Sequence, residues 1–131
     1  MMKFLSKYRY CLWGAVLIVL DAISKQWALA SCAVEQQLTP FLSCEIAYNH
    51  GISFGWFAQY GWVANQIFSV ILASFVIYLL TTVHKNLENK SLKNSLVGET
   101  LVIAGGIGNL IDRFVYGHVI DFIYVHYGQF A

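Results

Sequence analysis

The residues best suited to chemistry gather in one stretch near the end of the chain, GNLIDRFVYGHVID at residues 108–121. Asn109, Asp112 and Arg113 are spaced i, i+3 and i+4, so a helix would present them on one face. Asp121 follows shortly after them, and the apolar run LVIAGGI comes directly before the stretch. Ionisable side chains are costly in such a segment and tend to be functional. The cluster therefore predicts a functional site.

A second pair of charges lies in the first third of the chain. Asp21 and Lys25 are spaced i, i+4, so the carboxylate and the ammonium group can pair on one helix face. The spacing fits a structural ion pair between helices as well as a part in the site. The sequence leaves both interpretations open.

The histidines suggest metal binding as an alternative chemistry. His118, Asp121 and His126 carry groups that ligate metals, but their spacing does not match a zinc motif of the HExxH kind. No serine or cysteine stands in a recognisable nucleophile motif. The glycines of GGIGN do not follow a strand, as a dinucleotide site requires. We therefore expect neither a metal nor a cofactor.

The composition indicates that this site belongs to a membrane protein. The chain has 131 residues, of which 58% are hydrophobic and 11% are charged, whereas a soluble domain carries about 25% charged residues. A small soluble domain leaves much of its surface in water and could not bury so much apolar surface. The net charge of +1 gives no electrostatic case for binding nucleic acid.

Three apolar segments are long enough to cross a bilayer, at approximately residues 10–29, 62–83 and 96–115. The middle one has no charged residue over twenty-two positions, about 33 Å of helix against a hydrocarbon core of about 30 Å. We expect residues 1–131 to form a single all-α membrane domain, a polytopic helical bundle.

The lysines and arginines predict how this bundle is oriented. Residues 30–61 contain none, whereas basic residues precede the first span and occupy the loop at residues 84–95: Lys3, Lys7, Arg9, Lys85, Lys90 and Lys93. By the positive-inside rule, the N-terminus and this loop are cytoplasmic. Residues 30–61 and the segment after residue 115 then lie on the opposite side.

The segment between the first two spans predicts a small extracytoplasmic β-sheet, at approximately residues 36–57. Its residues 41–48 alternate in character as a strand does, and Asn49, His50 and Gly51 form a turn sequence. Aromatic residues suited to the headgroup region then lead into the second span: Phe54, Trp56, Phe57, Tyr60 and Trp62.

Cysteines and glycines give further expectations about packing. Three cysteines are an odd number, so no disulfide framework is implied, and Cys11 in its apolar run should pack. Cys32 and Cys44 would pair only in an oxidising compartment, and nothing else in the sequence favours that pairing. Gly105 and Gly108 should let a neighbouring helix approach closely.

Four blocks of the sequence, in order, resemble the lipoprotein signal peptidases (signal peptidase II), which are aspartic endopeptidases of bacterial membranes. VLDAISKQW and GGIGNLIDR resemble the first-helix and third-helix motifs, and GHVIDF resembles the block that follows. YNHGISFGWF resembles the motif Asn-x-Gly-x-Ala-Phe-Gly, with Ser53 where alanine is usual and with matches at Asn49, Gly51, Phe54 and Gly55.

The resemblance implies a multi-pass enzyme of the bacterial cytoplasmic (inner) membrane. It would cut the signal peptides of prolipoproteins just before a cysteine that carries a diacylglyceryl group. Two close carboxylates cannot both ionise easily, so one would act as base on a water while the other donates a hydrogen bond to the scissile carbonyl. The expected partners are prolipoproteins and membrane lipid, and the enzyme is expected to be a monomer.

The resemblance also assigns roles to single residues. Asp121 would be one member of the catalytic dyad. Asn49, Gly51 and Arg113 would bind substrate, while four residues would support the site: Asp21, Lys25, Asn109 and Asp112.

The second catalytic aspartate of the family has no match in this chain. In the family it belongs to an Asn-x-Ala-Asp motif that opens a fourth span, and the present sequence reads GQFA where that motif should begin. We expect a truncated piece of a longer protein that is inactive alone, with a natural remnant as the other interpretation.

Two alternative hypotheses, from other functional classes, remain open. Residues 29–32 read LASC, like the lipidation site of a lipoprotein precursor, but Asp21 and Lys25 interrupt the apolar region that should precede such a site. The other is a non-catalytic membrane subunit or a proton-carrying transport component that uses the Asp21–Lys25 pair.

Overall fold

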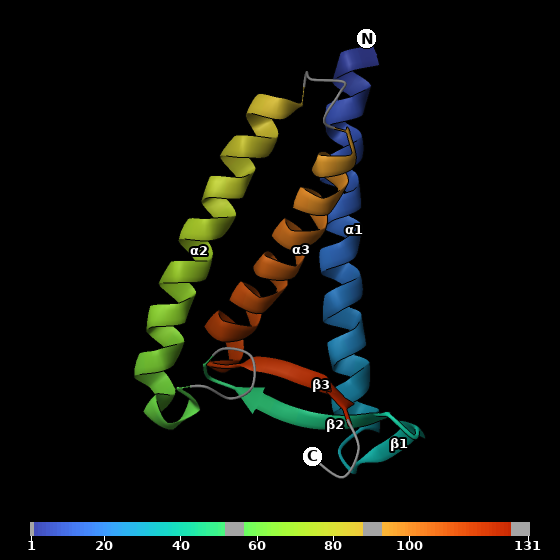
Figure 1. The fold of residues 1–131 in the computed structure, drawn as a ribbon, viewed down its shortest axis with the longest axis vertical. Helices are drawn as coiled ribbons and strands as arrows, with labels where there is room; N and C mark the ends of the chain where they lie inside the picture. Colours follow the sequence, from blue (N-terminus) through green and yellow to red (C-terminus); the bar gives the residue numbers. More distant parts are fainter. Residues whose placement is uncertain (1, 52–56, 88–92, 127–131) are drawn as a thin grey trace.

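The chain forms three long helices that stand on a small β-sheet at one end (Figure 1). The computed structural model describes residues 2–51, 57–87 and 93–126. The helices are α1 (Met2–Ser31), α2 (Gly61–Asn86) and α3 (Lys93–Tyr116), with a short 3-10 turn η2 (Ala58–Tyr60) before α2. The strands are β1 (Gln36–Thr39), β2 (Leu42–Asn49) and β3 (Val119–Val125).

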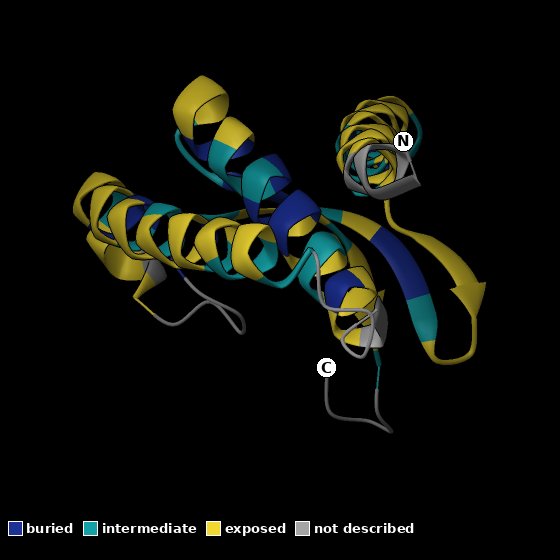
Figure 2. Ribbon diagram, turned by 90° about the horizontal axis from the view of Figure 1, so that it is seen from above, coloured by how far each residue is buried: buried dark blue, intermediate teal, exposed yellow. Residues whose placement is uncertain are grey.

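Each of the three apolar segments of the sequence forms a helix. Two stretches of the described chain, Tyr8–Ser31 and Gly61–Asn86, are long and apolar enough to cross a membrane by length and composition. Helix α3 carries Glu99, Asp112 and Arg113 within its length, which interrupts its apolar character. Large apolar side chains on the outer faces of α1 and α2 are exposed, and buried positions concentrate on α3 (Figure 2).

Helix α3 approaches both of its neighbours through glycines. A Cβ atom at Gly108 would lie 3.0 Å from the Cγ atom of Asp21 on α1, and a Cβ atom at Gly106 would lie 2.7 Å from Val76 on α2. Gly108 thus allows close approach as predicted, but the prediction for Gly105 is wrong because nothing lies within 4 Å of its Cβ position. Residues two apart point to nearly opposite sides of a helix, so Gly106 faces α2 and Gly108 faces α1.

The sheet has the order β1-β2-β3, and both pairings are antiparallel. The strand predicted at residues 41–48 is present as β2. The β2–β3 register pairs Cys44 with Ile123 and Ala47 with Asp121, with a bulge on β2 between these pairs. Strand β3 was not predicted, because its sequence VIDFIYV lacks a clear alternation. Part of the predicted turn and aromatic segment, residues 52–56, lies outside the described residues. This part contains Ser53, Phe54, Gly55 and Trp56.

A disulfide joins the end of α1 to the sheet, a pairing that the sequence left open. The sulfurs of Cys32 and Cys44 are bonded, and both residues are almost fully buried. They form a small core with Ala28 of α1, against which Ile46 and Phe122 pack. Cys11 is a free, exposed cysteine rather than a packed one.

Candidate active site

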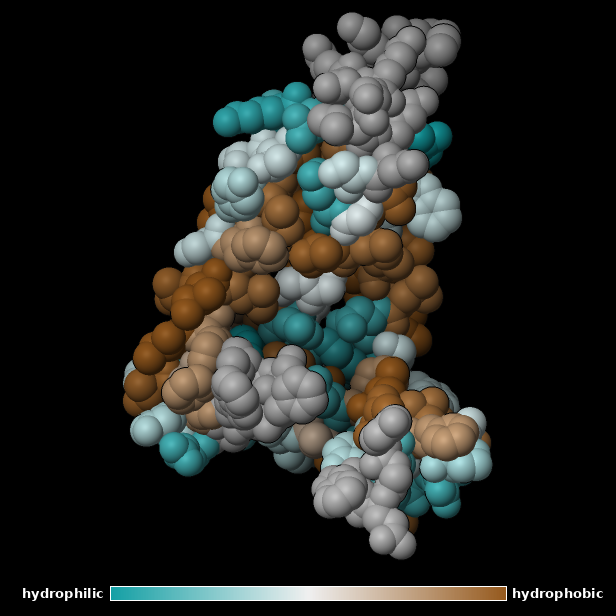
Figure 3. Space-filling view, in the orientation of Figure 1, coloured by the Kyte–Doolittle hydropathy of each residue, from teal (hydrophilic) through white to brown (hydrophobic). Residues whose placement is uncertain are grey.

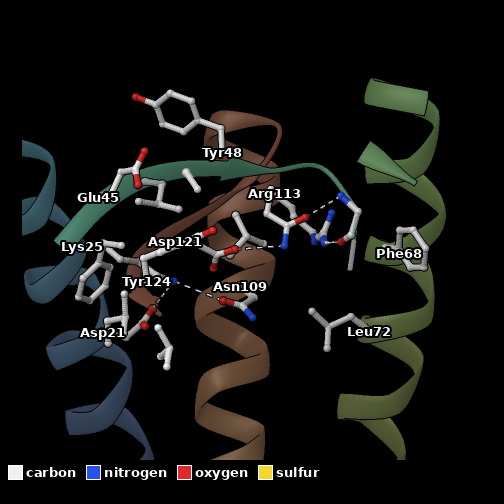
Figure 4. A pocket seen from close by; sticks show the side chains of 18 of the residues that line it. Asp21, Lys25, Glu45, Tyr48, Phe68, Leu72, Asn109, Arg113, Asp121 and Tyr124 are labelled. Atoms are coloured by element: carbon white, nitrogen blue, oxygen red, sulfur yellow. Dashed lines mark hydrogen bonds and ion pairs between the residues drawn. The ribbon is translucent and has the colours of Figure 1, made fainter. Parts of the chain in front are cut away.

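An ionic cluster links α1 to α3 next to the sheet, and Figure 4 shows its residues Asp21, Lys25 and Asn109 lying together. The Nζ atom of Lys25 lies 2.7 Å from Oδ2 of Asp21 and 2.7 Å from Oδ2 of Asp112. It also donates to Oδ1 of Asn109 at 3.4 Å. The side chains of Lys25 and Asp112 are only 6% and 7% exposed. The predicted Asp21–Lys25 pair is therefore present, and it extends across the helix interface to Asp112.

Asp112 also connects the ionic cluster to the sheet. Its Oδ2 atom accepts a hydrogen bond from the backbone amide of Ile120 at 3.2 Å. Ile120 is the residue before Asp121 on β3, so the buried carboxylate holds the backbone next to the exposed one. Sequence spacing could not show this contact because β3 was not predicted.

The carboxylate of Asp121 is oriented by an asparagine of the neighbouring strand. The side-chain amide of Asn49 donates to Oδ2 of Asp121 at 3.1 Å, and its Oδ1 atom accepts the backbone amide of Gly51 at 2.9 Å. The β2–β3 register brings these residues together, since Ala47 pairs with Asp121 and Asn49 pairs with Val119. Asp121 remains exposed, as a group that acts on a ligand must be.

Arg113 is buried and holds the turn that follows β2. Its guanidinium donates to the backbone carbonyls of His50 and Gly51, and to Oδ1 of Asn65 on α2 at 3.0 Å. These bonds tie α3 to both the turn and α2. Sequence reasoning missed Asn65, which is 2% exposed. An asparagine inside an otherwise apolar span was a signal that could have identified it.

Most of these residues, but not Asp112 or Asn65, border a cavity of about 1220 Å³ between the helices and the sheet. Its polar lining includes Asp21, Lys25, Asn109, Arg113, Asn49 and Asp121. Its α2 wall is apolar, with Phe68, Ile71, Leu72 and Phe75, and every residue of β3 lines it. Figure 3 shows the hydrophilic side chains in a hollow bordered by the hydrophobic surface of the helices. Six of the eight predicted site residues belong to the polar lining, and Gly51 also lines the cavity.

The residues considered for a metal are not brought together. The ring of His118 packs at 4.5 Å from Tyr48 and 5.4 Å from His50, while His126 Nε2 lies 2.8 Å from the hydroxyl of Ser43. Asp121 faces Asn49 instead. Within the described ranges, no group of three or more metal-ligating side chains gathers. Burial, and secondarily the neighbouring His50, lower the pKa of His118.

The geometry suits acid–base chemistry on an extended, partly apolar ligand. An exposed carboxylate, oriented by an amide, lies at the polar end of the cavity and can accept a proton from a bound water. In the ion cluster beneath it, Lys25 bridges the carboxylates of Asp21 and Asp112. The ionisable groups of the cluster are bound to one another, whereas the carboxylate of Asp121 is exposed and bonded to Asn49.

Comparisons with known proteins identify relatives of this chain. The sequence model of the family described as signal peptidase (SPase) II matches residues 14–131. The lipoprotein signal peptidase of Polynucleobacter necessarius subsp. necessarius (strain STIR1) is 32% identical over 130 residues, covering 98% of this chain and 78% of that protein. The lipoprotein signal peptidase of Rickettsia africae (strain ESF-5) is 35% identical over 119 residues, covering 88% of this chain but only 57% of that protein. The chain thus spans little more than half the length of some relatives.

The fold has a counterpart among solved structures. The structure of a bacterial membrane enzyme, determined by the in meso method at 1.9 Å resolution, is similar to this chain, with a TM-score of 0.67 and 22% identity. The match covers 94% of this chain and 79% of the chain of that enzyme. A second such structure, at 2.3 Å resolution, has a TM-score of 0.66. On the extent of the family match and the identity to its members, this chain belongs to the signal peptidase II family.

Proposed function

We propose that this chain carries part of the active site of an aspartic endopeptidase that removes signal peptides from diacylglyceryl-modified prolipoproteins, cutting before the lipidated cysteine. The observation that carries the proposal is the exposed carboxylate of Asp121, bonded to Asn49 at the polar end of a cavity with an apolar wall. A signal peptide presents such a combination, since its apolar segment ends at a polar peptide bond that has to be cut.

Asp121 serves in this proposal as one carboxylate of the dyad. It takes a proton from the attacking water, and Asn49 keeps it facing the cavity. The family resemblance assigns the second carboxylate to an aspartate that none of residues 1–131 matches. Asp112 cannot take this part, because its carboxylate is buried and bound to both Lys25 and Ile120.

The supporting residues act through the positions of these groups. Lys25, Asp21, Asn109 and Asp112 fix α1, α3 and the start of β3 relative to one another. Arg113 and Gly51 bind substrate in the proposal, and the structure adds that Arg113 holds the turn at Gly51 through its carbonyl. Asn65 joins this set as a support for Arg113.

We place the three helices across the cytoplasmic membrane with the N-terminus inside and the sheet outside. The distribution of basic residues supports this orientation. The Cys32–Cys44 disulfide supports it independently, because disulfides persist in oxidising compartments and these cysteines lie on the side assigned to the exterior. The same bond argues against Cys32 as a lipidated residue, since its sulfur is already bonded.

The direct test is cleavage of a purified prolipoprotein by a form of the enzyme that includes the family's second aspartate. Asp121→Asn should abolish cleavage and leave the thermal unfolding midpoint unchanged, because asparagine keeps the shape of the side chain but accepts no proton. Asp112→Asn should lower both activity and stability. Residues 1–131 alone should not cleave, because one carboxylate cannot be acid and base in the same step. Retained cleavage in Asp121→Asn would refute the assignment.

A further inference from the structure

Strand β3 has a free edge, and it lines the cavity along its whole length. Within the described residues, β3 pairs with β2 alone, so its second edge has no strand partner. All seven residues of β3 line the cavity, together with the facing apolar side chains of α2 such as Phe68 and Leu72. Such an edge offers a row of backbone donors and acceptors that can pair with another extended chain.

The side chains of this edge strand are unusually apolar for a free edge. Ile123 and Val125 are 64% and 69% exposed, and Tyr124 is 39% exposed. Proteins normally protect a free edge with charged residues, proline or a covering segment, because an exposed apolar edge invites pairing with other chains. Asp121 is the only charged residue of β3. The edge therefore has the composition of a pairing surface.

One end of this edge is already occupied. The backbone amide of Ile120 donates to the buried carboxylate of Asp112 at 3.2 Å, so it is not available to another strand. The open part of the edge begins at Asp121 and continues to Val125. At about 3.4 Å per residue, five residues extend over about 17 Å. The cavity, at about 1220 Å³, exceeds the 300–1,000 Å³ range of typical small-molecule pockets and has room for a peptide.

We propose that the polypeptide substrate binds as an added β-strand along the edge of β3 between Asp121 and Val125. Main-chain hydrogen bonds supply affinity in this mode, and alternate side chains enter pockets, here the apolar wall of α2. Pairing would fix one peptide carbonyl of the substrate beside Asp121, with the extended part of the substrate on the Val125 side of that carbonyl. The inference rests on the proposed function and adds the conformation in which the substrate is held.

The test is a scan of backbone N-methylation in a substrate peptide. The probe is a fluorescent nine-residue peptide whose cysteine carries a diacylglyceryl group, and its affinity for the detergent-solubilised chain is measured by fluorescence anisotropy. N-methyl groups are introduced at one residue at a time. Residues of a strand direct their amides alternately toward and away from the neighbouring strand, so alternate positions of one peptide serve as matched controls for each other.

We expect affinity to fall at every second position over about five residues, by about 2- to 12-fold for each lost hydrogen bond. The positions between them should bind as the unmodified peptide does. Equal loss at all positions would indicate a bound helix, and no loss at any position would indicate recognition by side chains and lipid alone. Either result overturns strand addition and leaves the proposed function standing, whereas failure of the unmodified peptide to bind contradicts both.

Discussion

Replacing Lys25 with methionine should destabilise this protein more than replacing either of its acidic partners. Lys25 lies 2.7 Å from both Asp21 and Asp112, so the three groups carry a net charge of −1. Without Lys25, two carboxylates remain near each other and one of them is buried. Without Asp112 or Asp21, a neutral ion pair remains. The lysine is therefore the one member whose loss leaves uncompensated buried charge.

The exposure of each side chain sets the expected magnitudes. Removing one partner of a buried pair costs about 3–5 kcal/mol, which we expect for Lys25→Met. Asp112→Asn keeps the shape but weakens hydrogen bonds to a charged group, worth about 1.5–3 kcal/mol. Asp21 is 32% exposed, and solvent screening should hold the effect of Asp21→Asn to about 1 kcal/mol or less.

The measurement is the free energy of unfolding in detergent, followed by the fluorescence of the four tryptophans during titration with SDS. Leu20→Met on the exposed face of the same helix is the control, with an expected change within about 0.5 kcal/mol. The Lys25→Met and Asp112→Asn double variant should be less destabilised than the sum of the single variants. An additive cycle, or an Asp21→Asn variant as unstable as Lys25→Met, would refute the bridging role of Lys25.

Three further changes probe other parts of the fold. Gly108→Ala should cost about 1–3 kcal/mol of unfolding free energy, because the new Cβ atom would meet Asp21. Gly105→Ala should not destabilise the protein, because nothing lies within 4 Å of its Cβ position, and equal effects of the two changes would contradict this packing. The double variant Cys32→Ser/Cys44→Ser should lose about 3 kcal/mol of unfolding free energy, because the disulfide closes a short loop, while Cys11→Ser should leave the stability unchanged. PEG-maleimide labelling of the unsubstituted chain under non-reducing conditions should detect Cys11 alone. Because burial lowers the pKa of His118, the unfolded chain takes up a proton at higher pH than the folded chain, so unfolding free energy should fall as the pH drops below about 6.5, and His118→Gln should reduce that slope.

The helices and the local charge pair were predictable because each depends on neighbouring residues. An apolar segment of span length forms a helix whatever surrounds it, and α2 begins within one residue of its predicted start. The Asp21–Lys25 pair follows from helical spacing alone. In the same way, the strand at residues 42–49 follows from alternation within eight residues.

The contacts that assemble the site were not predictable, because they join residues far apart in the chain. The Lys25–Asp112 and Arg113–Asn65 contacts depend on which helix faces pack together. The hydrogen bond of Asn49 to Asp121 requires strand β3, which has no clear alternation. The Cys32–Cys44 bond required knowing that the end of α1 meets β2. Gly106 was overlooked for the same reason, since its role depends on a second neighbouring helix.

The ionic cluster also explains why a chain with so few charges concentrates them at one level of the bundle. Helices in lipid gain little from burying apolar surface against each other, so close packing and polar contacts determine how they align. Here Gly108 brings α3 against α1 at the level of Asp21, and Lys25 joins the two helices through Asp112. Asp112 in turn holds Ile120 and so fixes the beginning of β3. The position of the exposed Asp121 is therefore set by buried charges on two helices, so the proposed chemistry of Asp121 depends on how the helices of the bundle are aligned.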